Sequence, residues 1–161
     1  GIVDQPRMLG EEVLGYKVIG SDSNLMDIAK QYGNAIITFG HVRNLNKRIE
    51  LFNLAIESGF ELPVIISPRA YVSKHSKIGK GTVIMHDALI NANTIVGENC
   101  IINSKALIEH DAIIEDHCHI STASVINGGT TVKANTFYGS NATSREYMEI
   151  GAFIKAGSVV K

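Results

Sequence analysis

Residues 84–120 read IMHDALINANTIVGENCIINSKALIEHDAIIEDHCHI, with a branched aliphatic residue at every sixth position. The same step continues on both sides, and its members are Ile66, Val72, Ile78, Ile84, Ile90, Val96, Ile102, Ile108, Ile114, Ile120, Ile126, Val132 and Tyr138. Four residues after each of them stands a small residue: Ala70, Ser76, Thr82, Ala88, Thr94, Cys100, Ala106, Ala112, Cys118, Ser124, Thr130, Thr136 and Ala142. Two columns that stay in phase for this long indicate one repeated structural unit.

A period of six with this composition is the hexapeptide repeat of a parallel β-helix. Each hexad is a short strand and a turn, and three hexads form one triangular coil of 18 residues. The β-branched column points into the prism, because its restricted side chains suit a crowded sheet surface. The residue before each small one lies in the turn and is often Gly, Asn or Asp, which tolerate left-handed backbone angles.

The repeat changes phase once, near its end. Ser144 and Ile150 keep the six-residue step, but the next core aliphatic residue is Ile154, and Val160 follows it at the regular spacing. Two residues are therefore missing from one hexad, which predicts a tightened corner between Ser144 and Ala152. Roughly fifteen hexads at three per turn predict about five coils.

The first 62 residues have a different pattern. Strand-like runs at residues 2–4, 15–20 and 35–40 alternate with helical apolar spacing at residues 24–32 and 44–58. Such alternation predicts a small parallel α/β sheet, with residues 35–40 as a buried strand. Residues 64–66 then lead into the first coil. We therefore expect an incomplete Rossmann-like α/β domain at residues 1–62 and a β-helix domain at residues 63–161.

Composition and charge argue against some classes of partner. The net charge of −1 over 161 residues offers no electrostatic reason to expect nucleic acid or an anionic membrane. No apolar run approaches the ~20 residues that span a bilayer, and no signal peptide is visible. Cys100 and Cys118 both belong to the small-residue column, which favours free interior thiols and a reducing compartment, so a cytoplasmic protein is expected.

Residues 102–121, INSKALIEHDAIIEDHCHIS, followed by INGG at 126–129, carry a more specific pattern. This tract resembles the family of hexapeptide acetyltransferases that modify bacterial amino sugars and sialic acids, and the resemblance covers nearly the whole chain. It implies that the β-helix is left-handed and that the α/β domain binds a nucleotide sugar. It also implies acetyl-CoA as co-substrate, with no metal, and a homotrimer whose active sites lie between neighbouring helices.

The resemblance assigns roles to several residues. It implies His110 as the general base, a role that a neutral imidazole fills by accepting a proton, and Asp111 as the acid that orients it. His119 would lie near the thioester of acetyl-CoA, and Ser140 and Ala156 would contact the coenzyme, although Lys155 stands where relatives often have glycine. Gly128 lies one coil after His110, where its amide can meet a developing oxyanion.

The same residues also have simpler explanations. Asp111 and His117 stand in the turn column, where Asp and His are favoured for the backbone alone. His119 is at an outward strand position and could serve packing between subunits. A zinc site of the kind found in some hexapeptide trimers needs a ligand 36 residues before a close histidine pair, and that step leads to Lys74, Gly81 and Val83. The zinc pattern therefore fails on spacing.

On the acceptor side, the resemblance points to Asp4 and Gln5 after the first strand, to Gly40, His41 and Arg43 in the loop after residue 39, and to Asn103 for the sugar. The chain starts at what should be the second strand of the α/β domain. The first strand and its glycine-rich phosphate loop are absent from the sequence, as is the short tail that usually follows the coil. A fragment of a longer protein is therefore expected.

The expected function is N-acetylation of a nucleotide-linked, UDP-linked 4-amino sugar in bacterial glycan biosynthesis. O-acetylation of sialic acid is the rival, because one base can serve an amine or a hydroxyl, and a non-catalytic hexapeptide scaffold is the alternative of another class. Outward aliphatic residues support an assembly, because a solvated wall would not need them. The homotrimer is expected to cover some of Ile95, Ile101, Leu107 and Ile113.

Overall fold

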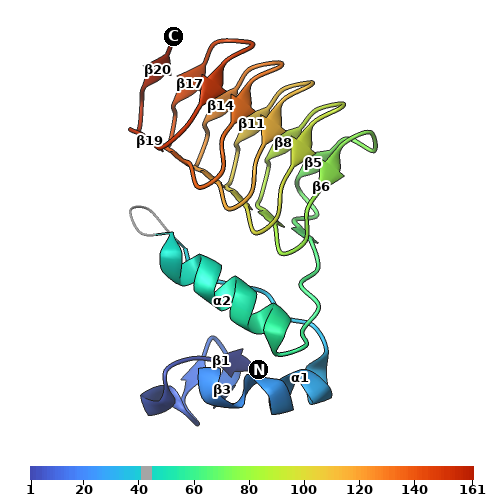
Figure 1. Ribbon diagram of the computed structural model, residues 1–161, viewed down its shortest axis with the longest axis vertical. Helices are drawn as coiled ribbons and strands as arrows, with labels where there is room; N and C mark the ends of the chain where they lie inside the picture. Colours follow the sequence, from blue (N-terminus) through green and yellow to red (C-terminus); the bar gives the residue numbers. More distant parts are fainter. Residues whose placement is uncertain (41–44) are drawn as a thin grey trace. The chain divides into compact units, whose positions relative to one another are not determined.

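The computed structural model describes residues 1–40 and 45–161. Residues 65–160 form a parallel β-helix, which Figure 1 shows as a stack of turns from green to red. Its strands are two residues long and make three parallel sheets of six, six and five strands, so the coil makes five complete turns and begins a sixth. This number agrees with the repeat count.

The first wall, called the β4 sheet, contains β4 (Ile65–Ile66), β7 (Val83–Ile84), β10 (Ile101–Ile102), β13 (His119–Ile120), β16 (Phe137–Tyr138) and β19 (Phe153–Ile154). The second, the β5 sheet, contains β5 (Tyr71–Val72), β8 (Leu89–Ile90), β11 (Leu107–Ile108), β14 (Val125–Ile126), β17 (Thr143–Ser144) and β20 (Val159–Val160). The third, the β6 sheet, contains β6 (Lys77–Ile78), β9 (Ile95–Val96), β12 (Ile113–Ile114), β15 (Thr131–Val132) and β18 (Glu149–Ile150).

The core of the coil consists of the two predicted columns. Ile90, Ile108 and Ile126 stack along one wall at 0% exposure, and the small residues Ala106 and Ala112 are equally buried at the corners. The turn column adopts positive φ, as the sequence predicts, even at Lys105 and Ala123, which have no special preference for it. The missing pair of residues falls between β18 and β19, and the shortened corner brings Ala152 to a φ of 71°.

Not every outward aliphatic residue is exposed. Ile95 and Ile113 on the β6 sheet are 43% and 38% exposed, and Leu107 on the β5 sheet is half-buried. Ile101 is buried within this chain, so the expectation that it is exposed on an outer wall was wrong. Its strand lies between β7 and β13, where Val83 and His119 are its ladder partners. The exposed apolar surface is therefore concentrated away from the middle of the β4 sheet.

Residues before the coil begin with a three-stranded sheet of β1 (Ile2–Val3), β3 (Tyr16–Gly20) and β2 (Glu12–Val13), in that order. β1 is parallel to β3, but β2 is antiparallel to it, so the sheet is mixed rather than parallel. The β2–β3 hairpin turns at Leu14 and Gly15, both at positive φ. Short 3-10 helices, η1 (Pro6–Met8) and η2 (Asp22–Asn24), precede β2 and α1 (Leu25–Tyr32) respectively.

The expected buried strand at residues 35–40 does not form. The backbone makes one isolated bridge, between Asn34 and Glu61. The carbonyls of Ile37 and Phe39 instead accept hydrogen bonds from Nη1 of Arg48, at 2.7 and 2.9 Å. A guanidinium thus occupies carbonyl groups that a neighbouring strand would otherwise use, and the apolar run reflects this local packing rather than a sheet interior.

Arg48 belongs to α2 (Asn46–Glu57) and is 2% exposed. Its Nε donates to the carbonyl of Asn99 in the coil at 3.3 Å, and burial lowers the pKa of its guanidinium to about 10. Through these contacts residues 37–52 group with residues 63–161 as one compact unit, while residues 1–36 and 53–62 form the other. One boundary between the two compact units falls between Leu62 and Pro63. Residues 37–52, which were expected in the first domain, group with the β-helix instead. In the described ranges no helix is long and apolar enough to cross a membrane.

Candidate active site

His110 lies in the turn that joins β11 to β12, at the corner between the β5 and β6 sheets. The backbone at the start of this turn is held by two hydrogen bonds of Glu109. Glu109 N–H donates to the carbonyl of Ile126 at 2.9 Å, and the hydroxyl of Thr94 donates to the carbonyl of Glu109 at 3.1 Å. The imidazole itself is 56% exposed. A fixed backbone thus presents an accessible ring, which suits a group that must meet a substrate.

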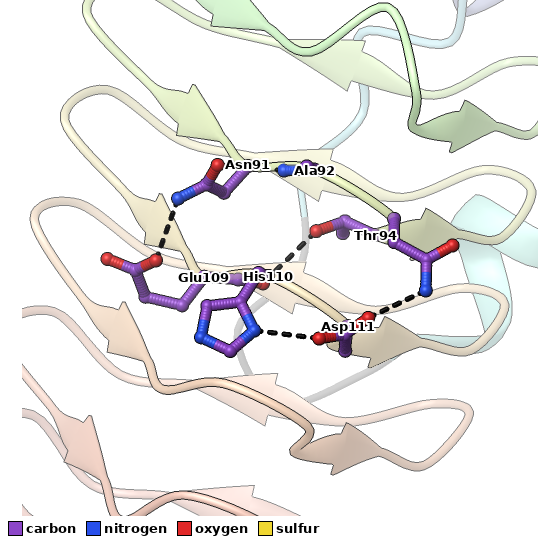
Figure 2. Close-up of polar contacts among 7 residues, drawn as sticks. Asn91, Ala92, Thr94, Glu109, His110 and Asp111 are labelled. Atoms are coloured by element: carbon purple, nitrogen blue, oxygen red, sulfur yellow. Dashed lines mark hydrogen bonds and ion pairs between the residues drawn. The ribbon is translucent and has the colours of Figure 1, made fainter.

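The imidazole and the next carboxylate form a pair (Figure 2). Nδ1 of His110 lies 2.7 Å from Oδ2 of Asp111. The other carboxylate oxygen of Asp111 accepts a hydrogen bond from Nδ2 of Asn93 at 2.6 Å. These hydrogen bonds, that of Asn93 first, lower the pKa of Asp111, so the carboxylate stays charged and fixes the tautomer with the proton on Nδ1. Nε2 of His110 is then the basic nitrogen.

The geometry of Asp111 is compatible with both explanations that the sequence left open. Its φ is 60°, which makes it a left-handed turn residue like the rest of its column. Its side chain nevertheless reaches His110 and orients the ring. The turn conformation is what directs the carboxylate, so the two roles are not alternatives.

Gly128, one coil after His110, lies directly against the His110 ring. A Cβ atom at this position would be 2.9 Å from Cε1 and 3.0 Å from Nε2 of His110. Carbon atoms in normal contact are ~3.5–4.0 Å apart, so no other residue fits while the ring keeps its place. Gly129 N–H donates to the carbonyl of His110 at 3.0 Å and fixes the two turns together. The absence of a side chain at Gly128 is therefore a requirement of the site.

A hollow of about 500 Å³ opens beside the ring. It is lined by Glu109, His110, Asn127, Gly128, Glu146 and Tyr147. Glu109 is oriented by Asn91, whose Nδ2 donates to its carboxylate at 2.8 Å (Figure 2). Four of these residues, Glu109, Asn127, Glu146 and Tyr147, were not predicted from the sequence, although the 18-residue step from His110 leads through Gly128 to Glu146. The hollow thus brings together the imidazole of His110, the backbone of Gly128 and the carboxylates of Glu109 and Glu146.

The second group of expected residues lies elsewhere on the prism. His119 is in β13 of the β4 sheet, where it is buried, with Nε2 3.3 Å from Nδ2 of Asn103 and its ring against the edge of Phe137. Ser140 lies at the corner between the β4 and β5 sheets, where its hydroxyl is 2.8 Å from that of Ser121. These residues do not line the hollow at His110. The β-helix of a single chain thus carries two groups of expected site residues that lie apart from each other.

The remaining expected contacts are dispersed. Ala156 is exposed at the same corner as Ser140, and its backbone N lies so close to Gly139 that a side chain there would collide with it. Asp4 accepts a hydrogen bond from Gln5 N–H at 2.6 Å in the first compact unit. Gly40 is exposed at the edge of the described chain. His41 and Arg43 lie outside the described residues.

Other chemistry-bearing side chains have structural roles. His117 keeps its turn conformation, with a φ of 59°, and packs its ring edge-on against Phe52, and burial lowers its pKa. Cys100 and Cys118 are buried free thiols, and the hydrogen bond with Cys118, followed by burial, raises the pKa of Cys100. Residues 1–40 and 45–161 contain no cluster of three or more His, Cys, Asp or Glu side chains suited to a metal ion.

Comparison with known proteins identifies the family. The model described as bacterial transferase hexapeptide, with six repeats, matches residues 75–110. The structure also resembles a mutant of perosamine N-acetyltransferase from Caulobacter crescentus, solved with CoA and GDP-perosamine. The sequences are 32% identical, the TM-score is 0.87, and the match covers 94% of this chain and 72% of that one. The chain belongs to the hexapeptide-repeat family of nucleotide-amino-sugar N-acetyltransferases.

A second relative supports the same assignment. The acetyltransferase domain of PglB from Neisseria gonorrhoeae is 29% identical, with a TM-score of 0.89 over 98% of this chain and 76% of that one. That domain has also been solved with acetyl coenzyme A. Comparison with curated protein sequences gives no significant match. The predictions of a left-handed parallel β-helix and of an acyltransferase of this family are thus confirmed.

Proposed function

We propose that this chain transfers the acetyl group of acetyl-CoA to the amino group of a nucleotide-linked 4-amino sugar in bacterial glycan biosynthesis. The observation that carries the proposal is the His110–Asp111 pair beside Gly128 at the wall of the hollow. Family membership supplies the class of reaction. A scaffold would need only the two repeat columns. At this corner, by contrast, hydrogen bonds hold the turn and the tautomer of His110, and a glycine lies against the exposed ring.

The proposed reaction uses the groups at this corner. Nε2 of His110 takes a proton from the sugar amine as the nitrogen lone pair attacks the thioester carbonyl carbon. A C–N bond forms, and the carbonyl oxygen becomes an oxyanion that the Gly128 N–H stabilises. The C–S bond then breaks, and the CoA thiolate takes the proton from the imidazolium. Asp111 stabilises the imidazolium through Nδ1 while the cation lasts, and the transfer of the Nε2 proton to the thiolate returns the ring to its neutral form.

The separation of the two halves of the site supports a homotrimer. His110 and Gly128 lie at the corner between the β5 and β6 sheets, while His119, Asn103, Ser140 and Ala156 belong to the β4 sheet and its corner with the β5 sheet. A three-fold assembly of this chain would place the β4 sheet of one copy near the His110 corner of the next. The exposed Ile95 and Ile113 would then be covered. In this arrangement the coenzyme contacts come from a neighbouring copy.

On the acceptor side we propose that Asp4, Gln5 and the loop of Gly40, His41 and Arg43 bind the nucleotide, with Asn103 on the sugar. The nucleotide proposed from the sequence is UDP, whereas the Caulobacter relative is solved with GDP-perosamine. The two free buried thiols fit a reducing compartment, so we place the reaction in the cytoplasm.

Release of CoA thiol tests the proposal. The protein is mixed with acetyl-CoA and, separately, with UDP-linked and GDP-linked 4-amino sugars, with sialic acid, and with no acceptor. The proposal expects acceptor-dependent thiol release with a 4-amino sugar, greater with the UDP-linked one. Release with sialic acid alone would assign O-acetylation, and release with none of them would leave the scaffold as the better explanation.

A further inference from the structure

The backbone ladder of the β5 sheet has one irregularity, and it lies beside the hollow. Elsewhere in this sheet, the residue after each strand donates its N–H to the carbonyl one coil further along. Asn91 donates to Ile108 and Glu109 donates to Ile126, both at 2.9 Å. Asn127 instead donates its N–H to the hydroxyl of Ser144 at 2.9 Å. The register between β14 and β17 accordingly contains only the Val125–Thr143 pair.

The freed carbonyl is not left without a donor. Nδ2 of Asn127 donates to the carbonyl of Ser144 at 2.7 Å, so side chain and backbone have exchanged partners. Ser144 explains the exchange, because it stands in the inward column that is otherwise Ile, Val or Tyr, and it is 2% exposed. A hydroxyl buried in an apolar interior needs a hydrogen-bond partner, and the nearest ladder N–H supplies it.

The exchange changes what the Asn127 side chain can do for the next residue. Asn91 and Asn103 stand at the equivalent place of their hexads, and each accepts a hydrogen bond from the following N–H. Oδ1 of Asn91 is 2.8 Å from Ala92 N (Figure 2), and Oδ1 of Asn103 is 2.7 Å from Ser104 N. Asn127 makes no such bond to Gly128, since its amide is held by Ser144. Within the described chain, the Gly128 N–H donates to no acceptor.

We infer that Ser144 is a positioning residue for acetyl transfer, which acts by holding the Asn127 amide away from the Gly128 N–H. The inference rests on the proposed function, in which that N–H stabilises the oxyanion. An N–H that already donates to a neighbouring amide would have to lose that bond before it could serve the transition state. Ser144 keeps the donor available before substrate binds, which is the preorganisation that makes such donors effective.

The test restores the regular ladder. In Ser144→Val the hydroxyl is gone, the Asn127 N–H returns to the carbonyl of residue 144, and the Asn127 amide turns to cap Gly128. We expect kcat to fall by ~10- to 10²-fold, below the ~10²–10³ for outright loss of an oxyanion donor, with both KM values little changed. Thermal stability should be kept or raised, because Val suits the inward column. Ser144→Ala makes the same change in the ladder without adding volume.

A second variant separates positioning from packing. In Ser144→Val combined with Asn127→Ala no amide remains to cap Gly128, so most of the lost kcat should return. Thr143→Val, on the same strand but outward, is the matched control and should behave as wild type. Wild-type kcat in both Ser144 variants would overturn the inference, as would a double variant as slow as the single one.

Amide hydrogen exchange at Gly128 gives a readout that needs no activity. The wild-type N–H should exchange rapidly, the Ser144→Val protein should protect it, and the double variant should expose it again. Equal exchange in all three proteins would contradict the inference even if the acetyltransferase activity is as proposed. Failure of the wild-type protein to acetylate any acceptor would instead remove the proposed function and leave the exchange pattern to decide the role of Ser144.

Discussion

Gly128→Ala should lower turnover without weakening the fold. The new Cβ would be 2.9 Å from Cε1 of His110, about 0.6 Å closer than a normal carbon–carbon contact. The ring cannot pivot freely, because its Nδ1 is held 2.7 Å from the Asp111 carboxylate. A misplacement of ~1 Å at a reacting group can cost ~10² in rate, so we expect kcat to fall by ~10- to 10²-fold.

The thermal stability of Gly128→Ala should rise slightly or stay unchanged. His110 is more than half exposed, so its displacement removes no core packing. Where the backbone conformation suits alanine, Gly→Ala raises the free energy of unfolding by ~0.4–1 kcal/mol, because it lowers the conformational entropy of the unfolded chain. Gly151→Ala is the matched control, since its Cβ would meet only Lys133, at 3.6 and 3.8 Å. The assay is steady-state thiol release together with thermal unfolding. Wild-type kcat in Gly128→Ala, or an equal loss in Gly151→Ala, would refute the reasoning.

Three further predictions concern the surroundings of the site. Asp111→Asn should reduce kcat with little change in melting temperature, because Asn tolerates a φ of 60°, whereas Asp111→Val should have a lower melting temperature. Normal kcat in the Asn variant would show that Asp111 serves only the turn conformation. Arg48→Met should lower the free energy of unfolding in urea by ~1–3 kcal/mol, since three carbonyls lose their donor, and an unchanged midpoint would contradict this. Light scattering at micromolar concentration should give a trimer, and Ile113→Lys should reduce its mass; a monomeric wild type would remove the homotrimer.

Most of the β-helix could be predicted from the sequence, because two repeat columns, one aliphatic and one small, indicate which residues lie inside and which lie at the corners. Ile108 and Ala112 belong to columns whose chemistry specifies inside and corner, and both are buried as expected. The 18-residue step also related Gly128 to His110 before any geometry was known. Periodicity was sufficient wherever each position makes the same contacts in every coil.

The sequence was insufficient where a contact depends on one side chain from outside the period. Residues 35–40 have the composition of a strand, but Arg48 takes the carbonyls that a partner strand would need. Ser144 could be recognised as the polar member of an apolar column, yet its exchange of partners with Asn127 depends on bond lengths that no pattern gives.

The central claim is that His110 is the base for acetyl transfer to a sugar amine, and one comparison tests it directly. Wild type and His110→Ala are given acetyl-CoA and the best 4-amino nucleotide sugar from the acceptor panel, and the product is identified by NMR. We expect an N-acetyl product stable to hydroxylamine, and a kcat lower by ~10²–10⁴ in the variant with an unchanged melting temperature. A hydroxylamine-labile O-acetyl product, or near-normal kcat in folded His110→Ala, would contradict the account.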